Sequence, residues 1–114
     1  MRKTLMLGSV ALLLGLSGAR AAEPESCATV RMAEPGWSDL AFTTGTASVI
    51  LKALGYGAES QVLGIPVIYQ AMENKQLDVF LGYWDPAMES YYAEFRDRGV
   101  VETVQQNLTG AKYT

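Results

Sequence analysis

The stretch that decides the fold reads Leu77-Asp78-Val79-Phe80-Leu81-Gly82-Tyr83-Trp84-Asp85-Pro86. Residues 77–83 have an apolar Val-Phe-Leu centre, which predicts a buried strand. Trp84 follows directly, and Asp85-Pro86 is typical of a helix start, with aspartate as the cap and proline in the first turn. The stretch therefore predicts a strand that turns into a helix, which is the repeating unit of α/β folds.

Strands and helices also alternate on both sides of this stretch. The signals are short apolar runs for strands, helical spacing of apolar residues for helices, and glycine or proline between them. We expect further strands at 29–33, 58–63 and 100–104, and helices at 40–54, 66–76 and 86–98. The order β-α-β-α-β-α-β predicts an α/β fold with right-handed crossovers and a mostly parallel sheet.

The first 21 residues have the pattern of a secretory signal peptide. Arg2 and Lys3 give a positive start, residues 5–16 are mainly apolar, and Ala19-Arg20-Ala21 places small residues where a signal peptidase cleaves. The apolar run is too short to cross a bilayer, which takes about 20 residues. We therefore expect cleavage after residue 21 and export to the periplasm; a retained N-terminal anchor is the alternative.

Charge and residue types exclude several classes of function. The sequence has 9 basic and 12 acidic residues and no histidine, and three of the basic residues lie in the signal segment. The remainder is therefore strongly acidic, which argues against nucleic acid as a partner. With no histidine and a single cysteine, Cys27, the sequence lacks the ligands of a metal cluster and the base of a Ser-His or Cys-His pair. We expect no cofactor, and Cys27 is either a free thiol or has a partner that is missing.

The two tryptophans occupy equivalent positions in the predicted fold. Trp37 follows the first predicted strand and Trp84 follows the third, each just before a helix. In open parallel sheets, ligands bind beyond the carboxyl ends of the strands. We therefore expect both indoles at the ligand-binding edge, where Tyr113 joins them if the last segment crosses the same edge. The alternative is that both tryptophans are ordinary packing residues.

An aromatic group of this kind suits a quaternary ammonium ion. Such an ion donates no conventional hydrogen bond, whereas the faces of aromatic rings are both negative and apolar. Asp39 lies two residues after Trp37 and can accept the hydroxyl of choline; a betaine would instead place its carboxylate on helix N-terminal amides. Asp39 and Asp85 also have a simpler interpretation as helix caps, with Ser38 as another candidate cap for the first helix.

Five motifs, in their order and spacing, resemble the choline and glycine-betaine substrate-binding proteins of ABC transporters. They are Gly36-Trp37-Ser38-Asp39, Ala53-Leu54-Gly55-Tyr56, Asp78-Val79-Phe80-Leu81-Gly82-Tyr83-Trp84, Pro86-Ala87-Met88-Glu89 and Gly110-Ala111-Lys112-Tyr113-Thr114. The resemblance covers the chain after the signal peptide and is strongest to the choline-binding branch.

This resemblance implies a periplasmic binding protein of the type II fold, in which two lobes close around the ligand and deliver it to a membrane permease. Residues 22–114 would form the N-terminal lobe, apparently truncated, because family members are much longer and take another aromatic wall from the second lobe. Trp37, Trp84 and Tyr113 look like three walls of the box, and Asp39 looks like the residue that meets the ligand's hydroxyl or cationic end. The implied protein is a monomer and not an enzyme.

Two other functions remain open from the sequence. An exported α/β enzyme lobe would use Asp39 and Asp85 as an acid–base pair, which requires displaced pKa values in a shared cleft. A structural periplasmic domain would bind no ligand, and its tryptophans would serve folding.

Overall fold

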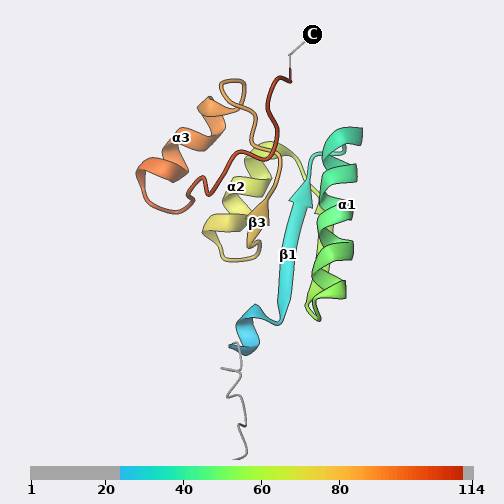
Figure 1. Ribbon diagram of the computed structural model, residues 1–114. Coiled ribbons are helices and arrows are strands. Elements are labelled where there is room, and N and C mark those ends of the chain that lie inside the picture. The colour runs from blue at the N-terminus through green and yellow to red at the C-terminus, as the bar shows by residue number, and fades with distance from the viewer. Residues whose placement is uncertain (1–23, 112–114) are drawn as a thin grey trace, which may run out of the picture.

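Strands and helices alternate along residues 24–111, which are the residues that the computed structural model describes. In chain order the elements are η1 (Glu25–Cys27), β1 (Thr29–Glu34), α1 (Ser38–Ala53), β2 (Gly57–Val62), α2 (Ile65–Glu73), β3 (Val79–Phe80) and α3 (Glu89–Asp97). The three strands form one parallel sheet in the order β2-β1-β3, so β1 is the central strand (Figure 1).

Both faces of β1 are covered by helices. Met32 and Ala33 are consecutive, so their side chains point to opposite faces, and each is only 1% exposed. The chain steps to opposite sides of β1 to reach β2 and β3, and right-handed crossovers then place α1 on one face and α2 on the other. Figure 1 shows α1 and α2 on either side of β1. This arrangement confirms the predicted α/β fold with a parallel sheet.

Aromatic rings connect α3 to α2 and to the end of β3. The ring of Tyr69 in α2 lies 6.1 Å from that of Tyr92 and 5.6 Å from that of Phe95, both in α3. Tyr69 also meets Phe80 of β3 edge to face at 5.9 Å. Beneath α2, the apolar core consists of Ala33, Ile68, Ala71 and Leu77. The position of α3 relative to the sheet is therefore set through α2.

The predicted breaks between elements are confirmed at three helix ends. Gly55 follows α1 with φ +95°, and Gly99 follows α3 with φ +68°. Glycine adopts this left-handed conformation without the steric cost that a Cβ atom brings. Pro66 lies in the first turn of α2, where its missing N–H group has no helical partner to lose.

β3 is much shorter than the strand predicted for residues 77–83. Before β3, the carboxylate of Asp78 accepts the backbone N–H of Arg31 at 2.8 Å, so a side chain takes the place of a ladder carbonyl. After the pair of Ala33 and Phe80, β1 extends by one more residue, Glu34, and then reaches Pro35, which has no N–H to donate. The ladder between β1 and β3 therefore stops after two residue pairs.

The prediction of a strand at residues 100–104 is wrong. The segment after α3 forms no ladder, and Val104 is 89% exposed. β3 offers an edge of only two residues, which is too short to pair with a further strand. Side chains hold the segment instead: the hydroxyl of Thr103 bonds to a tyrosine of α3 at 2.8 Å, and Asn107 donates to the carbonyl of Leu81 at 3.0 Å.

Two sequence predictions, the signal peptide over residues 1–21 and the aromatic wall Tyr113, lie outside the described residues. Within residues 24–111, no helix combines the length and the apolar character that crossing a membrane requires.

Candidate functional site

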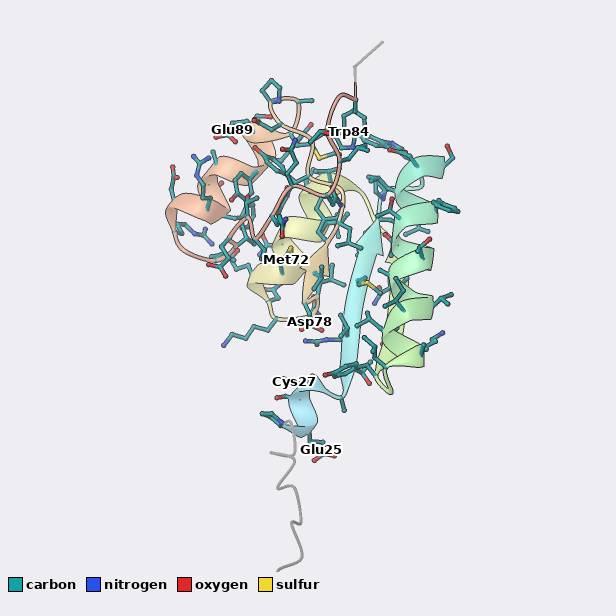
Figure 2. All side chains as sticks on the ribbon, viewed as in Figure 1. Glu25, Cys27, Met72, Asp78, Trp84 and Glu89 are labelled. Carbon is teal, nitrogen blue, oxygen red and sulfur yellow. The ribbon has the colours of Figure 1, made fainter. Side chains whose placement is uncertain are left out.

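The two tryptophans lie at the carboxyl edge of the sheet, where β1 and β3 end. Trp37 is the residue immediately before α1, three residues after β1, and Trp84 lies four residues after β3. Because β1 and β3 are parallel neighbours, the chain carries both indoles to the same edge. Figure 2 shows Trp84 at the end of the molecule to which the β1 arrow points. The structure thus places both tryptophans at strand-to-helix turns, as the sequence predicts.

A direct contact between Leu40 and Gly82 joins the two tryptophan turns. Leu40 lies in the first turn of α1 and is 5% exposed. A Cβ atom at Gly82 would lie 2.9 Å from Cδ2 of Leu40, closer still to its Cδ1, and 3.0 Å from the ring of Phe80. Any larger residue at this position would force the buried side chain of Leu40, or the backbone, to shift. The close approach of Gly82 packs the segment before Trp84 against the helix that follows Trp37.

A buried carboxylate shapes the turn before Trp37. Glu34, the last residue of β1, is 7% exposed, and its Oε2 accepts the backbone N–H of Gly36 at 2.5 Å. Gly36 has φ +85°, a left-handed conformation that favours glycine. Trp37 follows with 36% of its surface exposed, so its indole is accessible. Sequence reasoning did not single out Glu34; a carboxylate two residues before a turn glycine is the local signal that points to it.

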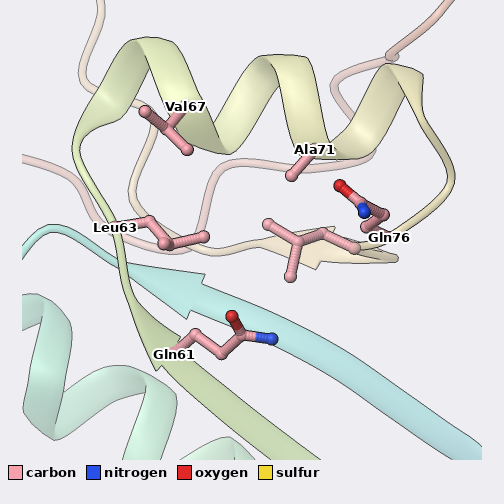
Figure 3. Close-up of a pocket in the computed structure, with 6 residues that line it drawn as sticks. Gln61, Leu63, Val67, Ala71 and Gln76 are labelled. Atoms are coloured by element: carbon pink, nitrogen blue, oxygen red, sulfur yellow. The ribbon is translucent and has the colours of Figure 1, made fainter.

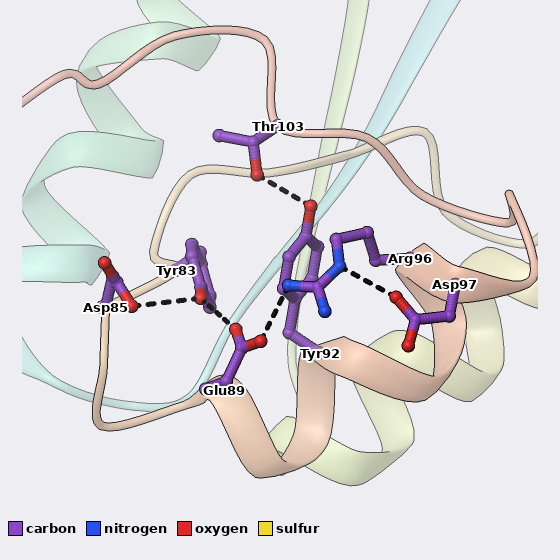
Figure 4. A network of polar contacts seen from close by, with 7 residues as sticks. All are labelled: Tyr83, Asp85, Glu89, Tyr92, Arg96, Asp97 and Thr103. Atoms are coloured by element: carbon purple, nitrogen blue, oxygen red, sulfur yellow. Dashed lines mark hydrogen bonds and ion pairs between the residues drawn. The ribbon is translucent and has the colours of Figure 1, made fainter.

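Tyr83 ties the turn that carries Trp84 to α3 (Figure 4). Its hydroxyl donates to Oε2 of Glu89 at 2.7 Å and lies 3.5 Å from Oδ1 of Asp85. Its ring centroid lies 4.4 Å from that of Tyr92, which is buried. Tyr83 lies in the turn after β3 and Glu89, six residues later, begins α3, so no local pattern in the sequence marks them as a pair.

The protonation states of Tyr83 and Glu89 support their hydrogen bond. Burial, and then the hydrogen bond to Glu89, raises the pKa of Tyr83 above its ordinary value. The hydrogen bonds from Tyr83 and from Arg96 lower the pKa of Glu89. At neutral pH, Glu89 is therefore an ionised acceptor and Tyr83 a neutral donor.

The predicted cap of the first helix is wrong. α1 begins at Ser38, and neither Ser38 nor Asp39 caps it with a side chain. The reason is that the backbone stays extended through Trp37, at φ −86° and ψ 138°, so Trp37 takes the cap position and its indole accepts no amide hydrogen there. Asp39 consequently lies inside the first turn with an exposed side chain, at the carboxyl edge and two residues from the indole.

Asp85 does not cap a helix either. Residues 85–88 form a separate turn, closed by the N–H of Met88 on the carbonyl of Trp84 at 2.8 Å, and α3 begins only at Glu89. This turn intervenes because the backbone folds back onto Trp84 before it becomes helical. Asp85 is exposed in this turn, near the hydroxyl of Tyr83.

A separate hollow lies between β2 and α2 (Figure 3). Its volume is about 220 Å³, and its lining residues are Gln61, Leu63, Val67, Ala71, Gln76 and Leu77. These side chains offer aliphatic and amide groups but neither an aromatic ring nor a charge, so the hollow does not suit a quaternary ammonium ion. The carboxyl edge remains the candidate site.

Comparison with known proteins identifies a family of binding domains. Residues 28–114 match the model of the substrate-binding domain of ABC-type glycine betaine transport systems. A protein of Chromohalobacter salexigens, called uncharacterized protein ORF1, is 46% identical over 88 residues, which are 77% of this chain and 57% of that protein.

Two solved structures of an ABC-transporter choline-binding protein have the same fold. The structure in complex with choline is 54% identical with a TM-score of 0.79, over 81% of this chain and 32% of the other. The unliganded semi-closed structure is 53% identical with a TM-score of 0.73, over 79% and 31%. The chain therefore spans about a third of the length of these structures.

These matches confirm the resemblance seen in the sequence motifs. The matched family and the two solved structures are substrate-binding proteins and not enzymes, so they give no support to an acid–base pair of Asp39 and Asp85. The family model matches residues 28–114, which are most of this chain. This chain therefore belongs to the family of substrate-binding domains of ABC-type glycine betaine transport systems.

Proposed function

We propose that this chain is part of the periplasmic solute-binding component of an ABC importer and that it binds a quaternary ammonium compound. Choline is the first candidate ligand and glycine betaine is the second. The observation that carries the proposal is the contact between Leu40 and Gly82, because it packs the turns of Trp37 and Trp84 together at the carboxyl edge. The identity of 54% with a choline-binding protein supports choline as the first candidate.

The chemistry of the edge fits such a ligand. Indole faces attract a methylated cation, and each desolvated contact contributes about 2 kcal/mol. After the costs of association are subtracted, three or four such contacts give micromolar affinity, which is a binding free energy of roughly −8 kcal/mol. The exposed carboxylate of Asp39 lies beside Trp37 and would accept the hydroxyl of choline. Tyr113 would supply a third wall.

The same family suggests which larger protein this chain belongs to and where that protein acts. We propose that residues 22–114 form the first lobe of a two-lobed protein, whose second lobe completes the box and closes over the ligand. The protein would leave the cytoplasm with its signal peptide, lose that peptide after Ala21, act as a monomer in the periplasm and deliver its ligand to a membrane permease.

Intrinsic fluorescence tests the proposal directly. The sequence holds two tryptophans, and both are proposed walls of the box, so emission changes report the site itself. Titration with choline should change the emission in a saturable way, and glycine betaine should do so at higher concentration. Ethanolamine, which keeps the hydroxyl but lacks the methyl groups, is the matched control and should have little effect. The proposal is overturned if choline, glycine betaine and carnitine leave the emission unchanged both in this chain and in the full-length two-lobed protein.

A second arm separates binding from a purely structural role of the tryptophans. Trp37 is 36% exposed and precedes α1, so we expect W37A to weaken choline binding strongly while thermal unfolding stays near that of the wild type. A ligand-free structural domain predicts the reverse, with a lower melting temperature and no binding to lose.

A further inference from the structure

The turn that carries Trp84 has little regular structure to hold it. β3 ends at Phe80, and α3 begins at Glu89. Between them, the carbonyl of Trp84 accepts the N–H of Met88 at 2.8 Å, and a side chain from the last segment bonds to the carbonyl of Leu81. These contacts fix the path of the backbone. The direction of the Trp84 indole then depends both on its own contacts and on how the neighbouring side chains are held.

Tyr83, the residue before Trp84, is held on two sides. Its ring lies against Tyr92 with centroids 4.4 Å apart, and Tyr92 is in turn packed on the buried ring of Tyr69. Its hydroxyl donates to Glu89 at 2.7 Å. A hydroxyl has one hydrogen, and the distance of 3.5 Å to Asp85 makes Glu89 its principal acceptor.

Glu89 is itself fixed from within α3. Its second oxygen, Oε1, accepts a hydrogen bond from Nη1 of Arg96 at 2.7 Å (Figure 4). The guanidinium group lies 5.3 Å from the centre of the Tyr92 ring and also donates to Asp97 at 3.0 Å. The carboxylate of Glu89 therefore bridges the turn and the helix, with one oxygen for each.

The direction in which Tyr83 is held has a consequence for Trp84 and therefore for the candidate site. Figure 2 places Glu89 on the α3 side of this end of the molecule and Trp84 on the α1 side. Tyr83 bonds to Glu89 on the α3 side, whereas the adjacent Trp84 lies on the α1 side, so holding Tyr83 toward α3 keeps the next residue on the side where α1 begins. We propose that Glu89, acting through Tyr83, is a positioning residue that holds the indole of Trp84 ready for the quaternary ammonium ligand.

This positioning role rests on the proposed function, and its test has one readout with ligand and one without. With ligand, E89A and Y83F should each raise the Kd for choline about tenfold, because the indole must be ordered at the moment of binding. Without ligand, in a W37F background where Trp84 is the remaining tryptophan, E89A should lower the emission anisotropy of Trp84. The double variant E89A/Y83F should bind no more weakly than either single variant, because both substitutions break the same hydrogen bond between Tyr83 and Glu89.

Two matched variants separate positioning from general stability. E89Q keeps an oxygen that accepts the Tyr83 hydroxyl but loses the charge that pairs with Arg96, so it should retain most of the affinity. D97N removes the charge of another partner of Arg96 and leaves the bond between Tyr83 and Glu89 intact, so it should match the wild type. A merely structural role of Glu89 predicts that E89A and E89Q lose stability and affinity together.

Wild-type Kd values and unchanged Trp84 anisotropy in both E89A and Y83F would overturn the positioning role. If E89A fails to fold, Y83F decides alone, because it removes a single hydroxyl. If the wild type binds neither choline nor glycine betaine, the proposed function fails. The anisotropy of unliganded Trp84 still decides, in that case, whether Glu89 holds the indole.

Discussion

Leu40 of α1 and Gly82 after β3 lie so close together that a side chain at position 82 would force Leu40 or the backbone to shift. The contact joins two segments that are 42 positions apart in the sequence, and each lies within three residues of a tryptophan of the candidate site. The packing of an aliphatic side chain on a backbone therefore brings together the two turns that carry the indoles.

Replacing Gly82 with alanine should disturb both the fold and the site. The added methyl group would overlap Leu40, and overpacking of this kind costs about 1–3 kcal/mol of unfolding free energy. Urea unfolding measures the loss, and choline titration should show weaker binding because Trp84 moves with the displaced backbone. Gly45 provides the control, since it lies within α1 with open space around it, and G45A should stabilise the helix by up to about 1 kcal/mol. A G82A variant as stable as the wild type would contradict the contact.

Removing the carboxylate of Glu34 should loosen the turn before Trp37. In E34A the N–H of Gly36 loses its partner at a part-buried position where the exposed glycine can reach water, so the loss should be about 1 kcal/mol. E34Q retains an oxygen that can accept this hydrogen bond and should lose less. Chemical unfolding measures both effects, and the emission of Trp37 in a W84F background should shift in E34A but not in E34Q. Equal stability of E34A and E34Q would show that the hydrogen bond is not the cause.

The parts of the fold that the sequence predicts correctly depend on local signals. Gly55 and Gly99 end helices because of their own backbone freedom, and Pro66 fits a first helical turn because of its own missing N–H. The strands at 29–33 and 58–63 were predicted to within one residue at each end. These signals involve a residue and its near neighbours, so they can be read without knowledge of the sheet.

The incorrect parts depend on contacts between distant residues. The length of β3 is set by Asp78, which bonds to the neighbouring strand through its side chain, and by Pro35, which ends the ladder on β1. An apolar run such as Val-Phe-Leu indicates burial, which is only partial here, and burial does not require a ladder. The strand predicted at 100–104 failed for the same reason, because a strand needs a neighbour of sufficient length.

The candidate site was predictable only in outline. Strand order and direction carry Trp37 and Trp84 to one edge, and both can be anticipated from alternating strands and helices. The groups that hold those indoles, Glu34 and the pair of Tyr83 and Glu89, meet their partners only in the folded chain. Each looks like an ordinary turn or helix residue in the sequence.

The buried hydroxyl of Tyr69 should make the protein sensitive to alkali. Tyr69 is 2% exposed, its hydroxyl has no hydrogen-bond partner among the described residues, and burial raises its pKa to about 12. The folded-state pKa lies above the ordinary value of about 10, so the folded protein favours the protonated hydroxyl. The contribution of this protonated form to the free energy of unfolding is complete below pH 10 and is lost as the pH rises toward 12. From about pH 9 to about pH 11.5, the contribution of Tyr69 should fall by about 2 kcal/mol.

Y69F isolates this contribution. It should be at least as stable as the wild type at pH 7, because it removes a buried polar group without a partner, and its stability should fall less steeply at high pH. Urea unfolding at several pH values gives both quantities. Parallel curves for Y69F and the wild type would mean that another group accounts for the alkaline loss.

Asp39 should discriminate between choline and glycine betaine. Its carboxylate is exposed in the first turn of α1, two residues after Trp37, where it can accept the hydroxyl of choline but repels the carboxylate of a betaine. D39N should therefore weaken choline binding about tenfold, since a charged acceptor is lost, and should leave glycine betaine binding unchanged or improved. Calorimetric titration with both ligands measures the change in preference. D85N is the matched control, because Asp85 is exposed in the Trp84 turn and should leave both affinities unaltered. A D39N protein that binds choline as tightly as the wild type would remove Asp39 from the site, and equal losses for both ligands would show that it acts through the general negative charge of this edge.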